Sequence, residues 1–217
     1  MNAAAGKTAL LFDMDGVLVD SNAMHRDSWI AVAERHGLPV RHAEEIGCCG
    51  LTTRDVIAKL LRWDVDDEEA TRLGEEKERL YREWIATRGI PAIPGVAAYV
   101  RRAAAAGFPC AVGTSAPKEN LEACLRALGI GDCFRACATS GGALRGKPAP
   151  DIYLAAAEAI GAAPETCVVF EDAANGIAAA KAAGMRAVGI LTAATKEELA
   201  QADAWHADFR SVPLPPL

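Results

Sequence analysis

Two aspartates one residue apart, Asp13 and Asp15, are the residues of this sequence best suited to chemistry. They follow an apolar stretch at 10–12 and precede Gly16, a residue type that lets the backbone turn or approach a ligand closely. Unpaired charge at the end of a buried strand is costly, and a divalent cation that binds carboxylate and carbonyl oxygens would offset that cost. One carboxylate can also attack a phosphoryl group and form an aspartyl-phosphate. The alternative for this segment alone is a strand that ends in an acidic turn.

Three later segments carry polar side chains that suit work on a phosphoryl group: Thr114 with Ser115, Lys147, and Glu171 with Asp172. Phosphoryl transfer needs positioning and charge neutralisation, and Mg²⁺ commonly binds one or two carboxylates together with phosphate oxygens. Lysine is a compact cation that suits a phosphate cluster. Taken singly, the segments have simpler interpretations, namely a helix cap, a solvated loop lysine and acids in a first helical turn. The lysine is not part of a P-loop, because a proline follows it.

Short apolar stretches alternate with helical patterns after residue 95. The expected strands are 109–113, 134–138, 167–170 and 187–191, and the expected helices are 96–106, 118–128, 151–160, 175–183 and 196–202. Glycines follow four of these helices, as in helix C-caps: Gly107, Gly129, Gly161 and Gly184. The alternation predicts an α/β fold, a Rossmann-like parallel sheet core with helices on both faces. Because ligands of such sheets bind beyond the carboxyl ends of the strands, we expect Asp13, Thr114 and Glu171 to converge there.

The part of the chain from 21 to 93 has a different character. It carries amphipathic helical patterns at 25–36, 55–62 and 67–88 and no convincing apolar strand. The proline- and glycine-containing segment 91–95 marks the return to the α/β pattern. We therefore expect a core domain formed by 1–20 and 94–217, with a helical domain at 21–93 inserted after the first strand.

Composition excludes several classes of function. The net charge of -6, from 23 basic and 29 acidic residues, argues against a general nucleic-acid surface. No run of about 18 apolar residues occurs, so no membrane span is expected, and the first residues lack the apolar core of a signal peptide, which predicts a cytoplasmic protein. The seven cysteines show neither a disulfide framework nor paired zinc spacing, which indicates reduced thiols. No interface stripe stands out, so we expect a monomer or a weak homo-oligomer.

Four segments together resemble a known family: Asp13-Met14-Asp15-Gly16, Thr114-Ser115, Gly146-Lys147-Pro148-Ala149-Pro150-Asp151 and Glu171-Asp172. Their types, order and rough spacing resemble the haloacid dehalogenase-like hydrolase superfamily, and more closely the branch of beta-phosphoglucomutase and small sugar-phosphate phosphatases. The resemblance covers nearly the whole chain. It implies a Mg²⁺-dependent enzyme that acts on a small phosphorylated metabolite through an aspartyl-phosphate, and it implies that the helical insert is a cap domain.

The resemblance also implies a role for each core residue. Asp13 would be the nucleophile, and Asp15 would be the general acid and then the base. Thr114 and Ser115 would contact phosphate oxygens, and Lys147 would neutralise the charge of the nucleophile and the phosphate. The implied Mg²⁺ ligands are Asp13, the backbone carbonyl of Asp15, Glu171 and Asp172.

In the cap domain, the resemblance points to three substrate-binding candidates. His25 stands twelve residues after Asp13, as a cap histidine does in beta-phosphoglucomutase. Gly50 and Arg54 lie in a segment that resembles the family's specificity loop. The simpler interpretations are a packing histidine and an arginine in an ordinary ion pair. The mutase pattern has a lysine before the loop glycine, where this chain has Cys49, and an arginine three residues after it rather than four.

These departures favour a phosphatase that transfers the phosphoryl group to water, with the mutase as the alternative. The acid at Asp15 argues against a dehalogenase, which lacks one at that position. A phosphonatase needs a cap lysine for imine chemistry, and nothing in the sequence marks Lys59 or Lys77 as buried. A non-catalytic phosphate-binding protein would be indicated by a lost nucleophile or metal ligand, and none is lost.

Overall fold

The computed structural model describes residues 8–42, 46, 53–139 and 144–215. The chain divides into two compact units. Met1–Asp20 and Pro91–Leu217 form one, here called the core unit, and Ser21–Ile90 form the other, here called the inserted unit. Gly50, one of the substrate-binding candidates, lies outside the described residues.

The core unit is built on a six-stranded parallel sheet with the strand order β3-β2-β1-β4-β5-β6. Its strands are β1 (Ala9–Phe12), β2 (Cys110–Thr114), β3 (Ala136–Thr139), β4 (Cys167–Glu171), β5 (Arg186–Ile190) and β6 (Ala204–His206). This is the order of the doubly wound Rossmann fold, and it confirms the predicted fold class. The order reverses beside β1, so β1 and β4 flank the point where such sheets bind their ligands.

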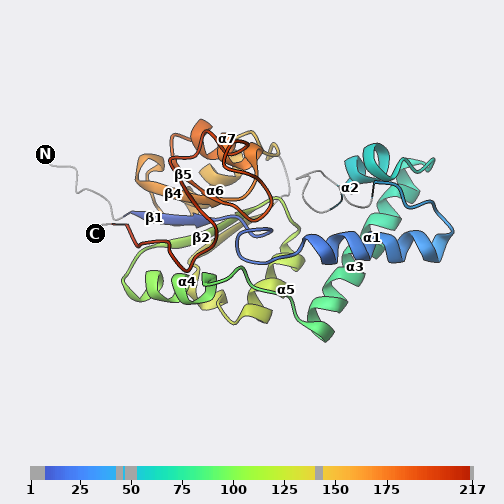
Figure 1. The fold of residues 1–217 in the computed structure, drawn as a ribbon, viewed down its shortest axis with the longest axis horizontal. Helices are drawn as coiled ribbons and strands as arrows, with labels where there is room; N and C mark the ends of the chain where they lie inside the picture. The colour runs from blue at the N-terminus through green and yellow to red at the C-terminus, as the bar shows by residue number, and fades with distance from the viewer. Residues whose placement is uncertain (1–7, 43–45, 47–52, 140–143, 216–217) are drawn as a thin grey trace, which may run out of the picture. The chain divides into compact units, whose positions relative to one another are not determined.

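Helices cover both faces of the sheet, with α4 and α5 on one face and α6 and α7 on the other (Figure 1). The helices are α4 (Val96–Ala105), α5 (Lys118–Leu128), α6 (Asp151–Ala159) and α7 (Ala174–Ala182), with short 3₁₀ turns at Gly131–Cys133 and Pro164–Thr166. Every residue of β1, β2 and β4 is buried, as expected for parallel strands covered on both sides. The continuous apolar runs in the sequence therefore reflect burial on two faces.

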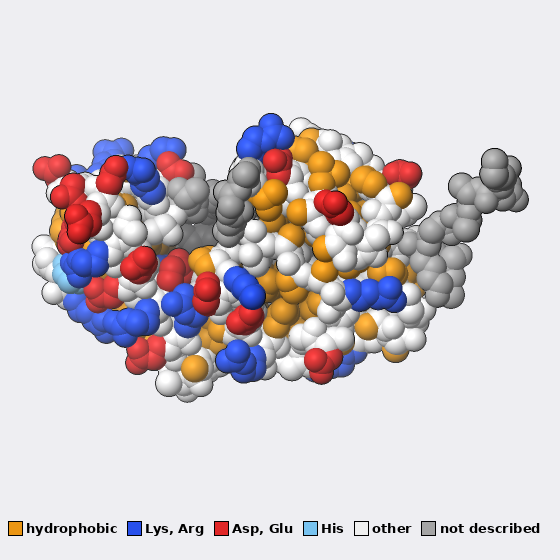
Figure 2. All heavy atoms as spheres, turned by 180° about the vertical axis from the view of Figure 1, so that it is seen from behind, with side chains coloured by type: hydrophobic (Ala, Val, Ile, Leu, Met, Phe, Trp, Pro, Cys, Tyr) orange, Lys and Arg blue, Asp and Glu red, His pale blue; other side chains and the backbone are white. Residues whose placement is uncertain are grey.

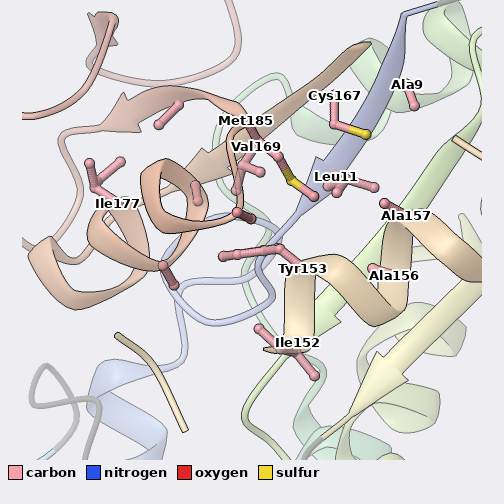
Figure 3. Close-up of a cluster of buried hydrophobic side chains, with 14 of the residues drawn as sticks. Ala9, Leu11, Ile152, Tyr153, Ala156, Ala157, Cys167, Val169, Ile177 and Met185 are labelled. Carbon is pink, nitrogen blue, oxygen red and sulfur yellow. The ribbon is translucent and has the colours of Figure 1, made fainter. Parts of the chain in front are cut away.

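Alternate residues of the central strands enter two different cores, because successive side chains of a strand point to opposite faces. Leu11 and Val169 pack with residues of α6 and α7 (Figure 3). Phe12 and Phe170 point the other way and stack, with ring centroids 4.9 Å apart. Tyr99 of α4 meets both rings edge-on. The strand ends that precede Asp13 and Glu171 are therefore anchored by aromatic packing on one face of the sheet.

The predicted helices from 96 to 183 are confirmed to within a residue at each end. The four glycines after them all have positive φ angles, from 60° at Gly129 to 84° at Gly107, which confirms their role in ending the helices. The predicted helix at 196–202 is wrong, because this segment forms turns. Thr195 and Glu198 exchange bonds of the kind that begin a helix. The indole N–H of Trp205 donates a hydrogen bond to the carbonyl of Leu199. The chain then continues into β6, a strand that the sequence did not predict.

The inserted unit is helical in its described residues. It contains α1 (Asn22–His36), α2 (Thr53–Asp55), the π-helical segment Val56–Leu61 and α3 (Asp67–Arg88). α1 packs against α3 around a core that includes Trp29, Trp63 and Leu73. The side chain of Asp66 caps α3 by accepting the N–H of Glu69 (2.8 Å). Among the described residues of both units, no helix is long and apolar enough to cross a membrane.

Candidate active site

The carboxyl ends of β1 and β4 bring the acidic residues together. Phe12 pairs with Phe170 in register, so the residues that follow them, Asp13 and Glu171, lie side by side. The backbone N–H of Asp13 donates to the carbonyl of Phe170 (3.0 Å), which fixes the start of the loop after β1. One carboxylate oxygen from each of Asp13, Glu171 and Asp172 lies within 4.8 Å of the others. Residues 158 positions apart in the sequence therefore form one acidic cluster.

Lys147 provides the positive charge of this cluster. Its Nζ lies 3.0 Å from Oδ2 of Asp13 and 2.6 Å from Oε1 of Glu171. The side chain is only 6% exposed, so water screens these ion pairs little. The simpler interpretation of Lys147, a solvated loop lysine, does not describe this arrangement.

Glu171 is held by donors on both of its oxygens. Oε1 accepts from Lys147 and from the hydroxyl of Tyr153 (2.8 Å), and Oε2 accepts from the backbone N–H groups of Asp172 (2.9 Å) and Ala173 (3.0 Å). A Cβ at Gly176 of α7 would overlap the Glu171 carboxyl group, so the glycine makes room for it. The carboxylate is therefore fixed in a single orientation against the first turn of α7.

With its three carboxyl groups ionised, the cluster has more negative than positive charge. Burial raises the pKa of Asp13 to about 7, against the opposing effect of Lys147 and with help from the neighbouring carboxylates. Burial and the charge of Glu171 raise the pKa of Asp172 well above its ordinary value. Burial also acts to raise the pKa of Glu171, but Lys147 and the hydrogen bonds outweigh it and hold that pKa below its ordinary value. The charges of Asp13 and Glu171 keep Lys147 protonated, because they raise its pKa despite burial.

The donor set fits a hard divalent cation. Among the described residues, Oδ1 of Asp13 is a buried side-chain oxygen without a hydrogen-bond partner. Mg²⁺ in proteins coordinates carboxylate oxygens of this kind. The neighbouring carboxylate of Asp172, whose negative charge is unfavourable in this buried position, is a second such ligand. A cation at this point would favour the ionised form of both Asp13 and Asp172.

The loop after β1 holds Asp15 in a tight turn. Gly16 has φ +71°, its N–H donates to the carbonyl of Val19 (2.8 Å), and a Cβ on it would overlap the carboxylate of Asp172. Its carbonyl accepts a hydrogen bond from the hydroxyl of Thr192 (2.6 Å), which follows β5. The turn thus requires glycine both for its positive φ angle and for the close approach of Asp172. Thr192, which the sequence did not single out, stabilises the turn.

Thr114 and Ser115 follow at the same edge of the sheet. Thr114 is the last residue of β2, the neighbour of β1, and it is buried. Its Oγ1 accepts the N–H of Ala116 (3.1 Å), a local bond of the capping kind. Ser115 is exposed. Thr114 therefore forms the local turn bond of its simpler interpretation, and it also lies on the strand next to β1.

The inserted unit contains the other candidates. The ring of His25 stacks on Tyr81, with centroids 4.2 Å apart, and its Nδ1 lies 2.7 Å from Nζ of Lys77. Lys77 is buried, with 3% of its surface exposed, which the sequence did not indicate. Lys59 is exposed and forms an ion pair with Asp55. Arg54 is exposed and forms an ion pair with Asp67. This is the ordinary ion pair that the sequence offered as the simpler interpretation of Arg54.

Comparison with known proteins decides the family. Residues 7–184 match the haloacid dehalogenase-like hydrolase family. The chain belongs to this family. The match confirms the resemblance that the four segments indicated.

Relatives of this hydrolase act on phosphate esters. The validoxylamine A 7'-phosphate phosphatase of Streptomyces hygroscopicus subsp. limoneus is 31% identical, with 94% of this chain and 95% of the relative covered. The fructose-1-phosphate phosphatase of Escherichia coli is 34% identical, with 83% and 95% covered. Such relatives confirm the predicted enzyme class, a phosphoric monoester hydrolase.

Solved structures place the hydrolase near the predicted branch. The beta-phosphoglucomutase of Clostridium difficile superposes with a TM-score of 0.81 at 25% identity, over 96% of this chain and 94% of that one. CbbY from Rhodobacter sphaeroides, solved in complex with phosphate, superposes with a TM-score of 0.85 at 29% identity, over 95% and 96%. Both a phosphatase and a mutase therefore occur among proteins similar to this chain.

Proposed function

We propose that this hydrolase is a Mg²⁺-dependent phosphatase that hydrolyses a small sugar or polyol phosphate through an aspartyl-phosphate on Asp13. The observation that carries the proposal is the largely buried Asp13 carboxylate, 3.0 Å from Lys147 and beside Asp172, with Asp15 in the next turn. The substrate class is supported by relatives whose names specify fructose 1-phosphate and a hexitol.

In the first half-reaction, the Asp13 carboxylate attacks phosphorus while the bond from phosphorus to the leaving oxygen breaks. Asp15 donates a proton to that oxygen, so the product leaves as an alcohol. Lys147 neutralises charge on the nucleophile and the phosphate, and Thr114 and Ser115 contact phosphate oxygens.

In the second half-reaction, the carboxylate of Asp15 takes a proton from water as the water oxygen attacks the aspartyl-phosphate. The bond between phosphorus and the Asp13 oxygen breaks, which releases inorganic phosphate and restores the enzyme. Asp15 thus alternates between acid and base, as a group in a loop next to the nucleophile is able to do.

Mg²⁺ would be held by Asp13, the backbone carbonyl of Asp15 and Asp172, with Glu171 in the same set although both its oxygens already accept hydrogen bonds. When bound, it would neutralise the excess negative charge of the cluster and of the phosphate. The orphaned Oδ1 of Asp13 supports this assignment.

We further propose that residues 21–93 act as a cap domain that selects the substrate, with His25, Gly50 and Arg54 as its substrate-binding residues. Two observations support it. The segment from Ser21 to Ile90 is compact by itself and has its own apolar core. His25 is held between Tyr81 and Lys77, which fixes its ring for a polar contact.

A mutase is the second candidate, favoured by the similarity to beta-phosphoglucomutases. It would return the phosphoryl group to a sugar rather than to water. Cys49, which stands where the mutase pattern has a lysine, favours the phosphatase.

A panel of phosphate monoesters with Mg²⁺ tests the proposal and separates the candidates. Sugar and polyol phosphates should release inorganic phosphate, and beta-glucose 1-phosphate with glucose 1,6-bisphosphate should give little glucose 6-phosphate.

Asp13→Asn should lower turnover by about 10⁴-fold or more, because the amide is a poor nucleophile of nearly the same shape. Asp132→Asn, at an exposed site in the same unit, is the matched control and should keep full activity. Substantial turnover by pure Asp13→Asn protein would refute the assignment.

A further inference from the structure

Tyr153 is a fully buried side chain that touches the catalytic cluster at two points. It extends from the first turn of α6 into the core beside the central strands (Figure 3). Its hydroxyl donates to Oε1 of Glu171 (2.8 Å), and Nζ of Lys147 lies 4.9 Å from the centroid of its ring. A core tyrosine needs one partner for its hydroxyl, but here the partner is a carboxylate of the site.

The position of the Lys147 ammonium depends on these contacts. Lysine has a flexible stem and no fixed geometry at its charged end, so its neighbours must hold it. Here they are Asp13, Glu171 and the face of the Tyr153 ring, which attracts a cation by its quadrupole. Lys147 and the Tyr153 hydroxyl share one acceptor, Oε1 of Glu171, so the hydroxyl also fixes the oxygen that the ammonium contacts.

The ring itself is held by the strand that leads to Thr114. A Cβ at Gly113 would lie 3.0 Å from Cδ1 of Tyr153, which is tighter than ordinary packing. Glycine at this position therefore lets the ring sit directly against β2. The ring cannot shift toward the sheet, and the hydroxyl and the lysine above it keep their places.

We propose that Tyr153 is a positioning residue for phosphoryl transfer, one that holds Lys147 between Asp13 and Glu171 where it receives the phosphate. The inference rests on the proposed function. Tyr153 does not touch the substrate. It acts through Lys147, and its effect should therefore disappear when the lysine is absent.

Tyr153→Phe removes only the hydroxyl and keeps the ring, and two measurements test it. With the sugar phosphate that the wild type hydrolyses best, kcat should fall about 10-fold, with a smaller change in KM, since a misplaced charge matters most in the transition state. The affinity for inorganic phosphate, measured by calorimetry with Mg²⁺, should fall about 5-fold, because one charge-assisted contact is weakened. Tyr99→Phe is the matched control, since Tyr99 is equally buried and donates its hydroxyl to the carbonyl of Pro213 (3.4 Å). It should change both values less than 2-fold.

The route through Lys147 is tested in a double-mutant cycle on phosphate affinity. In a Lys147→Ala background, Tyr153→Phe should have no further effect. A loss that persists in that background, or an equal loss in Tyr99→Phe, would overturn the proposal, as would wild-type values for Tyr153→Phe.

Gly113→Ala is a second variant that displaces the ring and keeps the hydroxyl, and it should reproduce the loss of kcat. If the wild type hydrolyses no phosphate monoester, the proposed function fails, and the calorimetric cycle still decides the role of Tyr153 in placing Lys147.

Discussion

At the scale of single residues, the site is a set of carboxylates with too little positive charge. Asp13, Glu171 and Asp172 lie together, and Lys147 is the cation that the structure places among them. Proteins tolerate such an excess where a ligand relieves it, and the unrelieved state costs stability. The residues that would bind Mg²⁺ should therefore lower the free energy of unfolding of the metal-free protein.

Asp172→Asn should stabilise the metal-free protein and abolish the activity. Burial and neighbouring charge raise the pKa of Asp172, so its negative form opposes folding, and an amide of the same shape removes that charge. In a chelator at neutral pH, urea unfolding should show a gain of about 1 kcal/mol. Asp132→Asn, at an exposed position, should show no change. A loss of stability in Asp172→Asn would mean that its carboxylate is already well satisfied without a metal.

The sequence makes some of these residues visible and hides others. Asp13 and Asp172 stand out because acids directly after an apolar run are unusual, and strand pairing then brings them together. Tyr153 is hidden, because in a helical pattern a buried tyrosine cannot be told from ordinary core. Thr192 and Lys77 are hidden too, since their contacts come from partners 176 and 52 residues away.

At the scale of elements, the strands flanking the site are buried by apolar packing, whereas one end of the sheet is also held by specific polar bonds. The end of the sheet at β6 is tied in this second way. Asp203, just before β6, accepts bonds from Nζ of Lys181 (2.8 Å) and from the N–H of Ala187 (2.7 Å). One carboxylate thus connects α7, β5 and the start of β6. The sequence missed β6 because three half-buried residues give no apolar run.

Asp203→Asn should reveal this tie through the pH dependence of stability. Burial acts to raise the pKa of Asp203, but the bonds from Lys181 and Ala187 outweigh it and lower that pKa below 3.8. A lowered pKa means stability that is present above 3.8 and is lost as pH falls through the folded value. The variant should be less stable than wild type by about 1 kcal/mol at neutral pH, a value kept small because the group is partly exposed.

The measurement is urea unfolding of both proteins at neutral pH and near pH 3, where the two curves should approach each other. A difference that stays constant between the two conditions would mean that the charge of Asp203 plays no part.

At the scale of the whole molecule, the two units differ in what stabilises them. The inserted unit depends on its apolar core around Trp29 and Leu73. The core unit contains the acidic cluster, so a cation bound there would stabilise that unit. Because the two units are each compact, we expect them to unfold in separate steps.

Mg²⁺ should therefore raise the melting temperature of one transition only. At about 100 times its dissociation constant, a ligand adds about 2.7 kcal/mol to the unit that binds it. Calorimetry in chelator and then in Mg²⁺ should show one transition shift upward, and Asp172→Asn should abolish the shift. Activity should be absent in chelator and return with Mg²⁺. A shift of equal size in wild type and Asp172→Asn would place the cation elsewhere.

The aromatic packing around Phe12, at the end of β1, has a consequence for the protein during its synthesis. Phe12 is made early, but the rings that pack around it include Phe170 and Phe209. At 5–20 residues per second, β1 waits about 10 to 40 s for the last of these partners to be translated. β2 is made earlier and pairs with β1, but part of the apolar surface around Phe12 stays uncovered for that time, and uncovered apolar surface favours association with other nascent chains. The inserted unit is complete much sooner and has a core of its own, so we expect it to fold while β1 still lacks its later partners.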